Sequence, residues 1–142
     1  MKLIITRHGE TEENKADIMQ GHLPGRLSLV GRKQAKKVAL RLKNEKIDFI
    51  FSSDLTRASD TAKEIAKFHP KTPITFVKEL RERNLGEFQG KKKNEFHNDP
   101  SRGVEPMEKM YTSLFEVVFG IGSAKAFVYL NNGIWKAYGR LK

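Results

Sequence analysis

The sequence contains no cysteine, a single tryptophan and no long apolar run. Without cysteine, the chain has no disulfide, no thiolate metal ligand and no thiol nucleophile. The apolar run at the amino terminus is broken by Arg7 and Glu10, so it is too short for a membrane span or a signal peptide. These absences predict a cytoplasmic protein without a membrane partner.

Acidic residues are also scarce, because 17 Asp and Glu stand against 27 Lys and Arg, for a formal net charge of +10. This excess favours anionic ligands, although Lys-rich helical faces can equally be solvated surface. Nucleic-acid binding would call for basic residues interleaved with exposed aromatic residues in a known module, and the sequence contains none that we recognise. We therefore expect an acidic small molecule as the partner, and no nucleic acid.

The order of predicted elements is that of one α/β domain covering residues 1–142. Apolar runs at 2–6, 47–53 and 74–77 predict strands. Apolar residues at helical spacing predict helices at 29–44 and 56–68, with Ser28 as the N-cap of the first. Strands that alternate with helices predict a three-layer sandwich, in which helices flank a mostly parallel central sheet.

The second half of the chain is less regular. The polar segment 91–105 is expected to form a mobile flap. Pro106 can begin a third helix, whose apolar stripe would be Met107, Met110, Tyr111, Leu114 and Val118. Two apolar runs on either side of Asn131-Asn132-Gly133 predict a closing β-hairpin.

The first predicted strand ends in Arg7-His8-Gly9, and Arg57 lies in the first turn of the second predicted helix. Ligands of parallel α/β sheets bind at the carboxyl ends of the strands, where helix N-termini also favour anions. An imidazole and two guanidinium groups at this edge predict a site for a phosphoryl group.

Three motifs resemble those of the histidine phosphatase superfamily, the phosphoglycerate-mutase-like enzymes. They occur in the family's order within the first 90 residues or so. They are Arg7-His8-Gly9-Glu10-Thr11 with Asn14, Gln20-Gly21, Leu27-Ser28 and Gly31; Ser52-Ser53-Asp54-Leu55-Thr56-Arg57-Ala58 with Thr61-Ala62; and Leu80-Arg81-Glu82 with Leu85-Gly86 and Gln89-Gly90.

The resemblance implies a metal-independent phosphomonoesterase that uses no cofactor. His8 would be the nucleophile that forms a phosphohistidine, and Arg7 and Arg57 would bind the phosphoryl oxygens. Glu82 would protonate the leaving oxygen and then activate water. These residue types suit those steps, because guanidinium groups match phosphoryl oxygens and a carboxyl group can act first as acid and then as base.

The same resemblance implies a substrate-binding role for Asn14, with Thr11, Gln20 and Gly21 as further candidates. Only the Leu-Arg-Glu match selects Glu82, because charge alone would also allow Glu79 or Glu87. Leu85 stands where the mutases resemble each other in having tyrosine, and Arg102 is the only arginine in the flap. Hydrolysis of a small phosphorylated metabolite is therefore the expected reaction.

One feature of the family is missing from the sequence. Its members have a second histidine at the end of a later strand, in Ser-His-Gly, whereas the other histidines here are His22, His69 and His97. None of these three ends an apolar strand, and we expect His22 and His69 to be exposed.

Two alignments of the tail are open. In the first, residues 127–137 take the place of that strand, and Asn131 replaces the histidine. In the second, which the sequence favours, residues 120–141 form the closing hairpin and the C-terminal part is shortened by the loss of the strand.

A missing strand would leave an unpaired sheet edge, which a homodimer could fill. The absent histidine leaves two hypotheses for function. The chain is an active phosphatase, or it is an impaired pseudophosphatase that binds phosphate or a protein partner without turnover.

Overall fold

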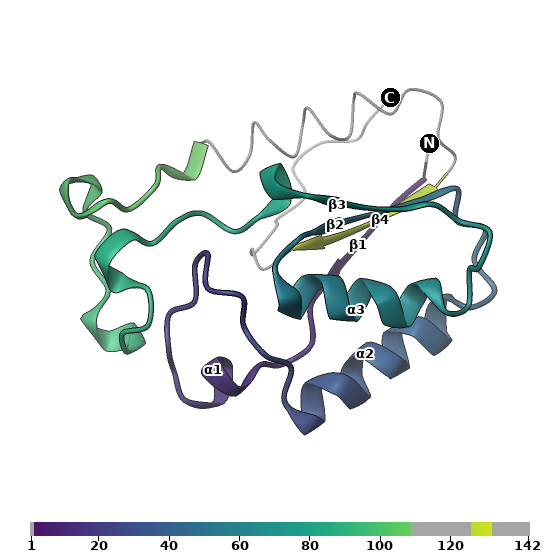
Figure 1. Ribbon diagram of the computed structural model, residues 1–142, viewed down its shortest axis with the longest axis horizontal. Helices are drawn as coiled ribbons and strands as arrows, with labels where there is room; N and C mark the ends of the chain where they lie inside the picture. Colours follow the sequence, from purple (N-terminus) through teal and green to yellow (C-terminus); the bar gives the residue numbers. More distant parts are fainter. Residues whose placement is uncertain (1, 109–125, 132–142) are drawn as a thin grey trace.

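A computed structural model describes residues 2–108 and 126–131. Its sheet has four strands: β1 (Lys2–Arg7), β2 (Phe49–Ser53), β3 (Ile74–Val77) and β4 (Ala126–Asn131). Their order is β1-β4-β2-β3, and all three pairings are parallel (Figure 1). The prediction of an α/β fold around a parallel sheet is confirmed.

Strand β4 lies between β1 and β2. It pairs with β1 from Lys2↔Ala126 to Arg7↔Asn131, and its other edge pairs with β2. A strand with both edges occupied has no edge left for a hairpin partner, so the predicted closing hairpin is wrong for its first limb. The second limb, at 134–138, lies outside the described residues. The prediction failed at this limb because an apolar run suits a buried parallel strand as well as a hairpin strand.

The position of β4 favours the first alignment of the tail over the second. A strand that follows the third predicted helix fills the space between β1 and β2, so no central strand is missing there. A homodimer was expected because a missing strand would leave one edge of β1 unpaired. Strand β4 pairs with that edge, so this reason for a homodimer no longer holds.

Helices α2 (Leu29–Leu42) and α3 (Thr56–Ala66) lie on one face of the sheet (Figure 1). The side chain of Ser28 accepts a hydrogen bond from the Gly31 N–H at 3.0 Å, as expected for an N-cap. The buried core between this layer and the sheet consists of Ala39, Leu42, Ile47, Ile50, Ala58, Ala62 and Ile65. In the predicted third helix, Met107 and Glu108 have helical backbone, and residues 109–125 lie outside the described part.

The loop after β1 and the chain after β3 together form a second unit, which we call the cap lobe (residues 12–27 and 84–105; Figure 1). It contains helix α1 (Glu12–Lys15) and three 3-10 turns, η2 (Gly86–Phe88), η3 (Lys93–Glu95) and η4 (Pro100–Arg102); another turn, η1 (Lys78–Leu80), leads into it. The sequence analysis missed α1.

Backbone hydrogen bonds join the two segments of the cap lobe. The Met19 N–H donates to Lys91 O, and the Gly90 N–H donates to Met19 O, both at 2.8 Å. Buried Leu85, Phe88 and Val104 form its apolar centre. The predicted flap 91–105 is therefore docked on the loop after β1. Within the described residues, no helix has the length and apolar character that crossing a membrane requires.

Candidate active site

His8 follows the last residue of β1, at the carboxyl edge of the sheet. Its side chain is 5% exposed, and Nδ1 lies 2.5 Å from the carbonyl oxygen of Gly9. Because a carbonyl only accepts hydrogen bonds, Nδ1 carries the proton. The other ring nitrogen, Nε2, is buried and has no hydrogen-bond partner among the described residues. The lone pair of His8 is therefore on Nε2.

Burial keeps this imidazole neutral. Loss of solvation lowers the pKa of His8 to about 4, even though the hydrogen bond to Gly9 opposes the shift. The positive charges of Arg57 and Arg7 lower the pKa further. At neutral pH the ring can therefore act as a nucleophile.

Two glycines allow the residues just after His8 to lie close to the start of helix α2. A β-carbon on Gly9 would lie 2.3 Å from the carbonyl oxygen of Gly31, and one on Gly31 would lie 1.9 Å from that of Glu10. The Gly9 N–H also donates to the buried hydroxyl of Thr61 at 3.2 Å. The backbone on either side of His8 is thus held by α2 and α3.

Arg57 is 1% exposed, and its guanidinium group donates to loop carbonyls. Its partners are Gly21 O at 2.9 Å, Pro24 O at 3.4 Å and Leu23 O. Burial lowers its pKa to about 10, so it remains a cation at neutral pH. The sequence predicts that Arg57 binds phosphoryl oxygens, and in the structure its guanidinium group also anchors the loop 21–24.

Glu82 comes from the segment that enters the cap lobe, and it meets Arg57. Its carboxylate Oε2 lies 3.7 Å from Nη2 of Arg57, and its side chain is 25% exposed. The backbone of Glu82 is also held, because its carbonyl oxygen accepts a hydrogen bond from His22 Nε2 at 2.7 Å. His8, Arg57 and Glu82 are thus linked by direct contact or by electrostatic interaction, although they come from three separate motifs.

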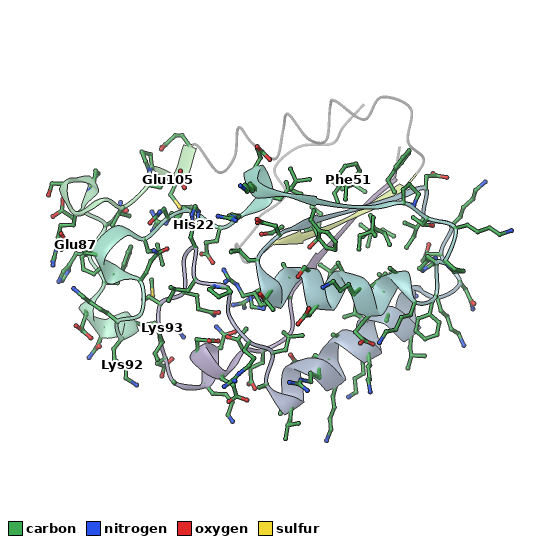
Figure 2. The ribbon with its side chains drawn as sticks, viewed as in Figure 1. His22, Phe51, Glu87, Lys92, Lys93 and Glu105 are labelled. Atoms are coloured by element: carbon green, nitrogen blue, oxygen red, sulfur yellow. The ribbon has the colours of Figure 1, made fainter. Side chains whose placement is uncertain are left out.

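The contact of His22 with Glu82 corrects the prediction that His22 is exposed. His22 lies at the tip of the loop after β1, against the segment that follows η1 (Figure 2). The prediction is also wrong for His69, which is buried and donates from Nε2 to Leu42 O at 3.1 Å. In both cases a distant carbonyl oxygen provides the partner, and this could not be seen from the neighbouring turn residues.

An ion pair fixes the residue before Glu82. Arg81 Nε donates to Asp54 Oδ1 at 2.6 Å, and Nη2 donates to Oδ2. The hydrogen bonds from Arg81 lower the pKa of the Asp54 carboxyl below its ordinary value. Both residues lie inside the motifs that carry the family resemblance, but the sequence does not show that they pair. They are the main functional candidates that sequence reasoning missed, together with His22.

Three other predicted site residues, Arg7, Gln20 and Gly21, differ in burial and in hydrogen bonding. Arg7 is exposed at the end of β1. Gln20 is buried, and its Oε1 has no hydrogen-bond partner in the described part of the chain. Gly21 has a φ of +50° and carries the carbonyl that Arg57 binds.

Thr11 and Asn14 bind each other. Asn14 N donates to Thr11 Oγ1 at 3.1 Å and Thr11 N donates to Asn14 Oδ1 at 3.0 Å, which caps α1. The structure therefore gives these two residues a structural contact, and no hydrogen bond among the described residues joins either of them to the His8 ring. Among the described residues, no three His, Asp or Glu side chains are grouped so that they could hold a metal ion.

A cleft of about 450 Å³ lies elsewhere, between α3 and the start of α2. Its lining includes Arg26, Arg32, Lys63 and Lys67, and it contains none of the predicted site residues. The chemistry of His8 is a better guide to the site than the size of this cleft, because it combines a free nucleophilic atom with nearby cations and a carboxylate.

Curated proteins with similar sequences carry the names of phosphatases and phosphoglycerate mutase-like proteins. The chain is 46% identical over 90 residues to phosphoglycerate mutase-like protein 4 of Arabidopsis thaliana, which covers 63% of this chain and 39% of that protein. It is 42% identical over 89 residues to glucosyl-3-phosphoglycerate phosphatase of Mycolicibacterium vanbaalenii, with 63% and 39% covered. The chain thus spans about two fifths of the length of these relatives.

Solved structures with the same fold cover more of the chain. A mycobacterial glucosyl-3-phosphoglycerate phosphatase in complex with VO3 aligns with a TM-score of 0.80 and 26% identity, over 92% of this chain and 74% of that one. Bacillus stearothermophilus YhfR aligns with a TM-score of 0.80 and 27% identity, over 92% and 73%. The family model of the histidine phosphatase superfamily (branch 1) matches residues 3–111. The chain belongs to the histidine phosphatase superfamily.

Proposed function

We propose that this chain hydrolyses a small phosphomonoester through a phosphohistidine on His8, without a metal ion. The observation that carries the proposal is the state of His8. Its Nδ1 is held by Gly9 O, its pKa is lowered to about 4, and its buried Nε2 has no hydrogen-bond partner among the described residues. A neutral imidazole with its lone pair free is the form that attacks phosphorus.

The proposed reaction has two steps. In the first, Nε2 of His8 forms a bond to phosphorus while the bond to the leaving oxygen breaks, and Glu82 gives its proton to that oxygen. In the second, the Glu82 carboxylate takes a proton from water, the water oxygen bonds to phosphorus, and the N–P bond breaks to release phosphate. Arg7 offers an exposed cation to the phosphoryl oxygens, and the Arg57 cation lies beside Glu82.

The substrate is expected to be a small phosphorylated metabolite. Relatives are named for glucosyl-3-phosphoglycerate, fructose 2,6-bisphosphate and phosphoserine, which are all small anions. The net charge of +10 and the unsatisfied Gln20 Oε1 support an anionic substrate with hydrogen-bond donors, with Thr11, Asn14 and Gly21 in the supporting loop. We propose the cytoplasm, where such metabolites occur, as its compartment.

We further propose that Asn131 stands in the place of the family's second histidine. Strand β4 ends at Asn131, whose backbone is in register with Arg7 at the carboxyl edge of the sheet. Asparagine cannot become protonated as histidine can, so it offers the phosphoryl oxygens no cationic donor at this position. Loss of one preorganised donor typically costs about a hundredfold to a thousandfold in rate, so we expect slow turnover that Asn131→His increases.

The test is release of phosphate from p-nitrophenyl phosphate in the presence of EDTA, together with trapping of an acid-labile phosphoenzyme. His8→Ala should abolish both signals, Glu82→Gln should slow release of phosphate, and His97→Ala, at an exposed position, should behave as the unmodified protein. Activity no higher than that of His8→Ala across a broad panel of phosphomonoesters would contradict the proposal. If vanadate nevertheless raised the melting temperature, and Arg57→Ala removed that effect, the pseudophosphatase hypothesis would replace it.

A further inference from the structure

The outward face of helix α2 combines positive charge with exposed aliphatic side chains. Its basic residues are all exposed, and they are Arg32, Lys33, Lys36, Lys37 and Arg41. Leu29, Val30 and Leu40 lie among them, with 75%, 50% and 52% of their surface exposed. We call these eight residues the α2 face.

The charge of the α2 face is not neutralised by its surroundings. Helix α2 contains no acidic residue. In the described part of the chain, none of its five cations takes part in an ion pair. An ordinary solvated helix face carries both signs, which offset each other at i,i+3 and i,i+4 spacing.

The neighbouring helix α3 provides the contrast within the same layer. Its Lys63 pairs with Asp60 at 3.5 Å, and Lys67, just past its end, pairs with Glu64 at 2.5 Å. The uncompensated charge is therefore a property of α2. Arg32 also lines the cleft between α3 and the start of α2, whose two carboxylates, Asp60 and Glu64, pair with Lys63 and Lys67.

We propose that the α2 face docks on the surface of an anionic lipid bilayer. The cations would meet lipid phosphates, while Leu29, Val30 and Leu40 would enter the boundary between headgroups and acyl chains. Two observations favour lipid over nucleic acid. The exposed apolar residues are aliphatic, so they offer no ring on which a base could stack. They also stand among the cations, so one surface offers a bilayer both electrostatic attraction and apolar side chains to insert.

Docking leaves the fold as it is. The opposite face of α2 contributes Ala35, Ala39 and Leu42 to the buried interior. Figure 1 shows α2 on the outer side of the molecule, away from the sheet, so the α2 face can contact a flat surface without unfolding. A surface contact of this kind needs no membrane span, but it departs from the sequence-based expectation that the protein has no membrane partner. No proposed catalytic or substrate-binding residue belongs to the face. The inference therefore does not depend on the proposed function.

The test is co-sedimentation of the protein with phosphatidylcholine vesicles, with and without phosphatidylglycerol, at low and at high salt. We expect binding only to the phosphatidylglycerol vesicles, and its loss at high salt. Each basic residue near an anionic surface strengthens binding by about fivefold, so the triple change Lys33→Gln, Lys36→Gln and Lys37→Gln should weaken it by on the order of a hundredfold. The matched triple change of exposed Lys15, Lys78 and Lys93 to Gln should weaken it far less.

Two further measurements separate the alternatives. The double change Leu29→Ser and Leu40→Ser leaves the charge unaltered and should still weaken binding to vesicles. In the unmodified protein, vesicles should slow amide hydrogen exchange in α2. The proposal is overturned if anionic vesicles do not bind at low salt, or if the two triple variants bind equally. Tight binding to single-stranded RNA that the leucine changes do not affect, without binding to vesicles, would overturn it in favour of a nucleic-acid surface.

Discussion

Burial decides what His8 can do. An exposed histidine would be partly protonated near neutral pH and bonded to water, whereas His8 is held neutral with Nδ1 on Gly9 O and Nε2 without a hydrogen bond in the described part of the chain. The same burial costs stability whenever the ring must be protonated. The proposed nucleophilic role of His8 and its acid sensitivity therefore have one cause.

This coupling predicts that stability falls on mild acidification. The folded protein keeps His8 neutral down to about pH 4, whereas the unfolded chain protonates it near its ordinary pKa of 6.5. Between these values the unfolded state binds more protons, so stability decreases as pH falls. We expect His8 alone to account for a loss of about 2 kcal/mol between pH 7.5 and pH 5.

Urea unfolding of the unmodified protein and of His8→Asn at both pH values measures this contribution. The asparagine amide can still donate to Gly9 O, and it does not titrate. The variant should therefore lose less stability than the unmodified protein over the same pH range. Equal losses in the two proteins would show that His8 is not held neutral by the fold.

At the scale of elements, the site depends on close contacts between backbones. Helix α2 begins at Leu29. In its first turn, the backbone of Gly31 lies close to the backbone of Gly9 and Glu10. Helix propensity by itself favours alanine over glycine inside a helix by about 1 kcal/mol. The tertiary contact opposes this preference.

We predict that Gly31→Ala destabilises the protein by about 2 kcal/mol or more, because the new β-carbon would lie 1.9 Å from the Glu10 carbonyl oxygen. The exposed Lys37→Ala change on the same helix should alter the free energy of unfolding by less than about 0.5 kcal/mol. Urea denaturation of both variants checks this. A stabilised Gly31→Ala protein would mean that helix propensity outweighs the clash with the Glu10 carbonyl.

A second element-scale prediction concerns the ion pair beside Glu82. Arg81 and Asp54 join the segment that leads into the cap lobe to the loop before α3. If this pair positions Glu82, Asp54→Asn and Arg81→Gln should each lower kcat by on the order of tenfold to a hundredfold, with a smaller change in KM. The double variant should be little worse than either single variant, because both remove the same contact.

The surface pair Lys67–Glu64 supplies the control, since it is far from the cap lobe in sequence and Lys67→Gln should leave kcat unchanged. Steady-state kinetics on p-nitrophenyl phosphate gives all of these values. Fully additive effects of the two single changes would argue that Arg81 and Asp54 act independently.

At the scale of the whole molecule, the described chain has two apolar centres. One lies between the sheet and helices α2 and α3, and the other is the cluster of Leu85, Phe88 and Val104 in the cap lobe. Phe88 is the centre of the second, because Phe96 packs against it edge-on at 5.4 Å and the Arg102 guanidinium lies 4.6 Å from its ring centroid. The lobe can therefore lose its packing while the sheet keeps its own.

We predict that Phe88→Ala opens the cap lobe first. Truncating a buried phenylalanine typically costs about 3–5 kcal/mol, and here the loss should fall mainly on residues 84–105. Amide hydrogen exchange should become faster in that segment and stay nearly unchanged in β2 and α3. The change of the half-exposed Phe68 to Ala is the control, and equal acceleration throughout the chain would contradict this division.

Local patterns in the sequence determined the first three strands and the two long helices, and they selected the proposed site residues. Helices predicted at 29–44 and 56–68 are observed at Leu29–Leu42 and Thr56–Ala66, and Ser28 caps the first. These features follow from contacts within one or two turns of the chain, so neighbouring residues suffice to predict them. The motifs likewise sufficed to select His8 and Glu82 as candidates for the site.

Only the tertiary structure decided how those residues are held. The apolar run near the tail predicted one strand of a hairpin. In the structure both edges of this strand, β4, are paired, so it is a central strand of the sheet. The side-chain hydrogen-bond partners of Arg57, His22 and Arg81 lie 27 to 60 residues away in sequence. Contacts over such separations depend on the packing of the whole chain, which is why sequence reasoning selected His8 and Glu82 but missed the contacts that hold the segment around Glu82.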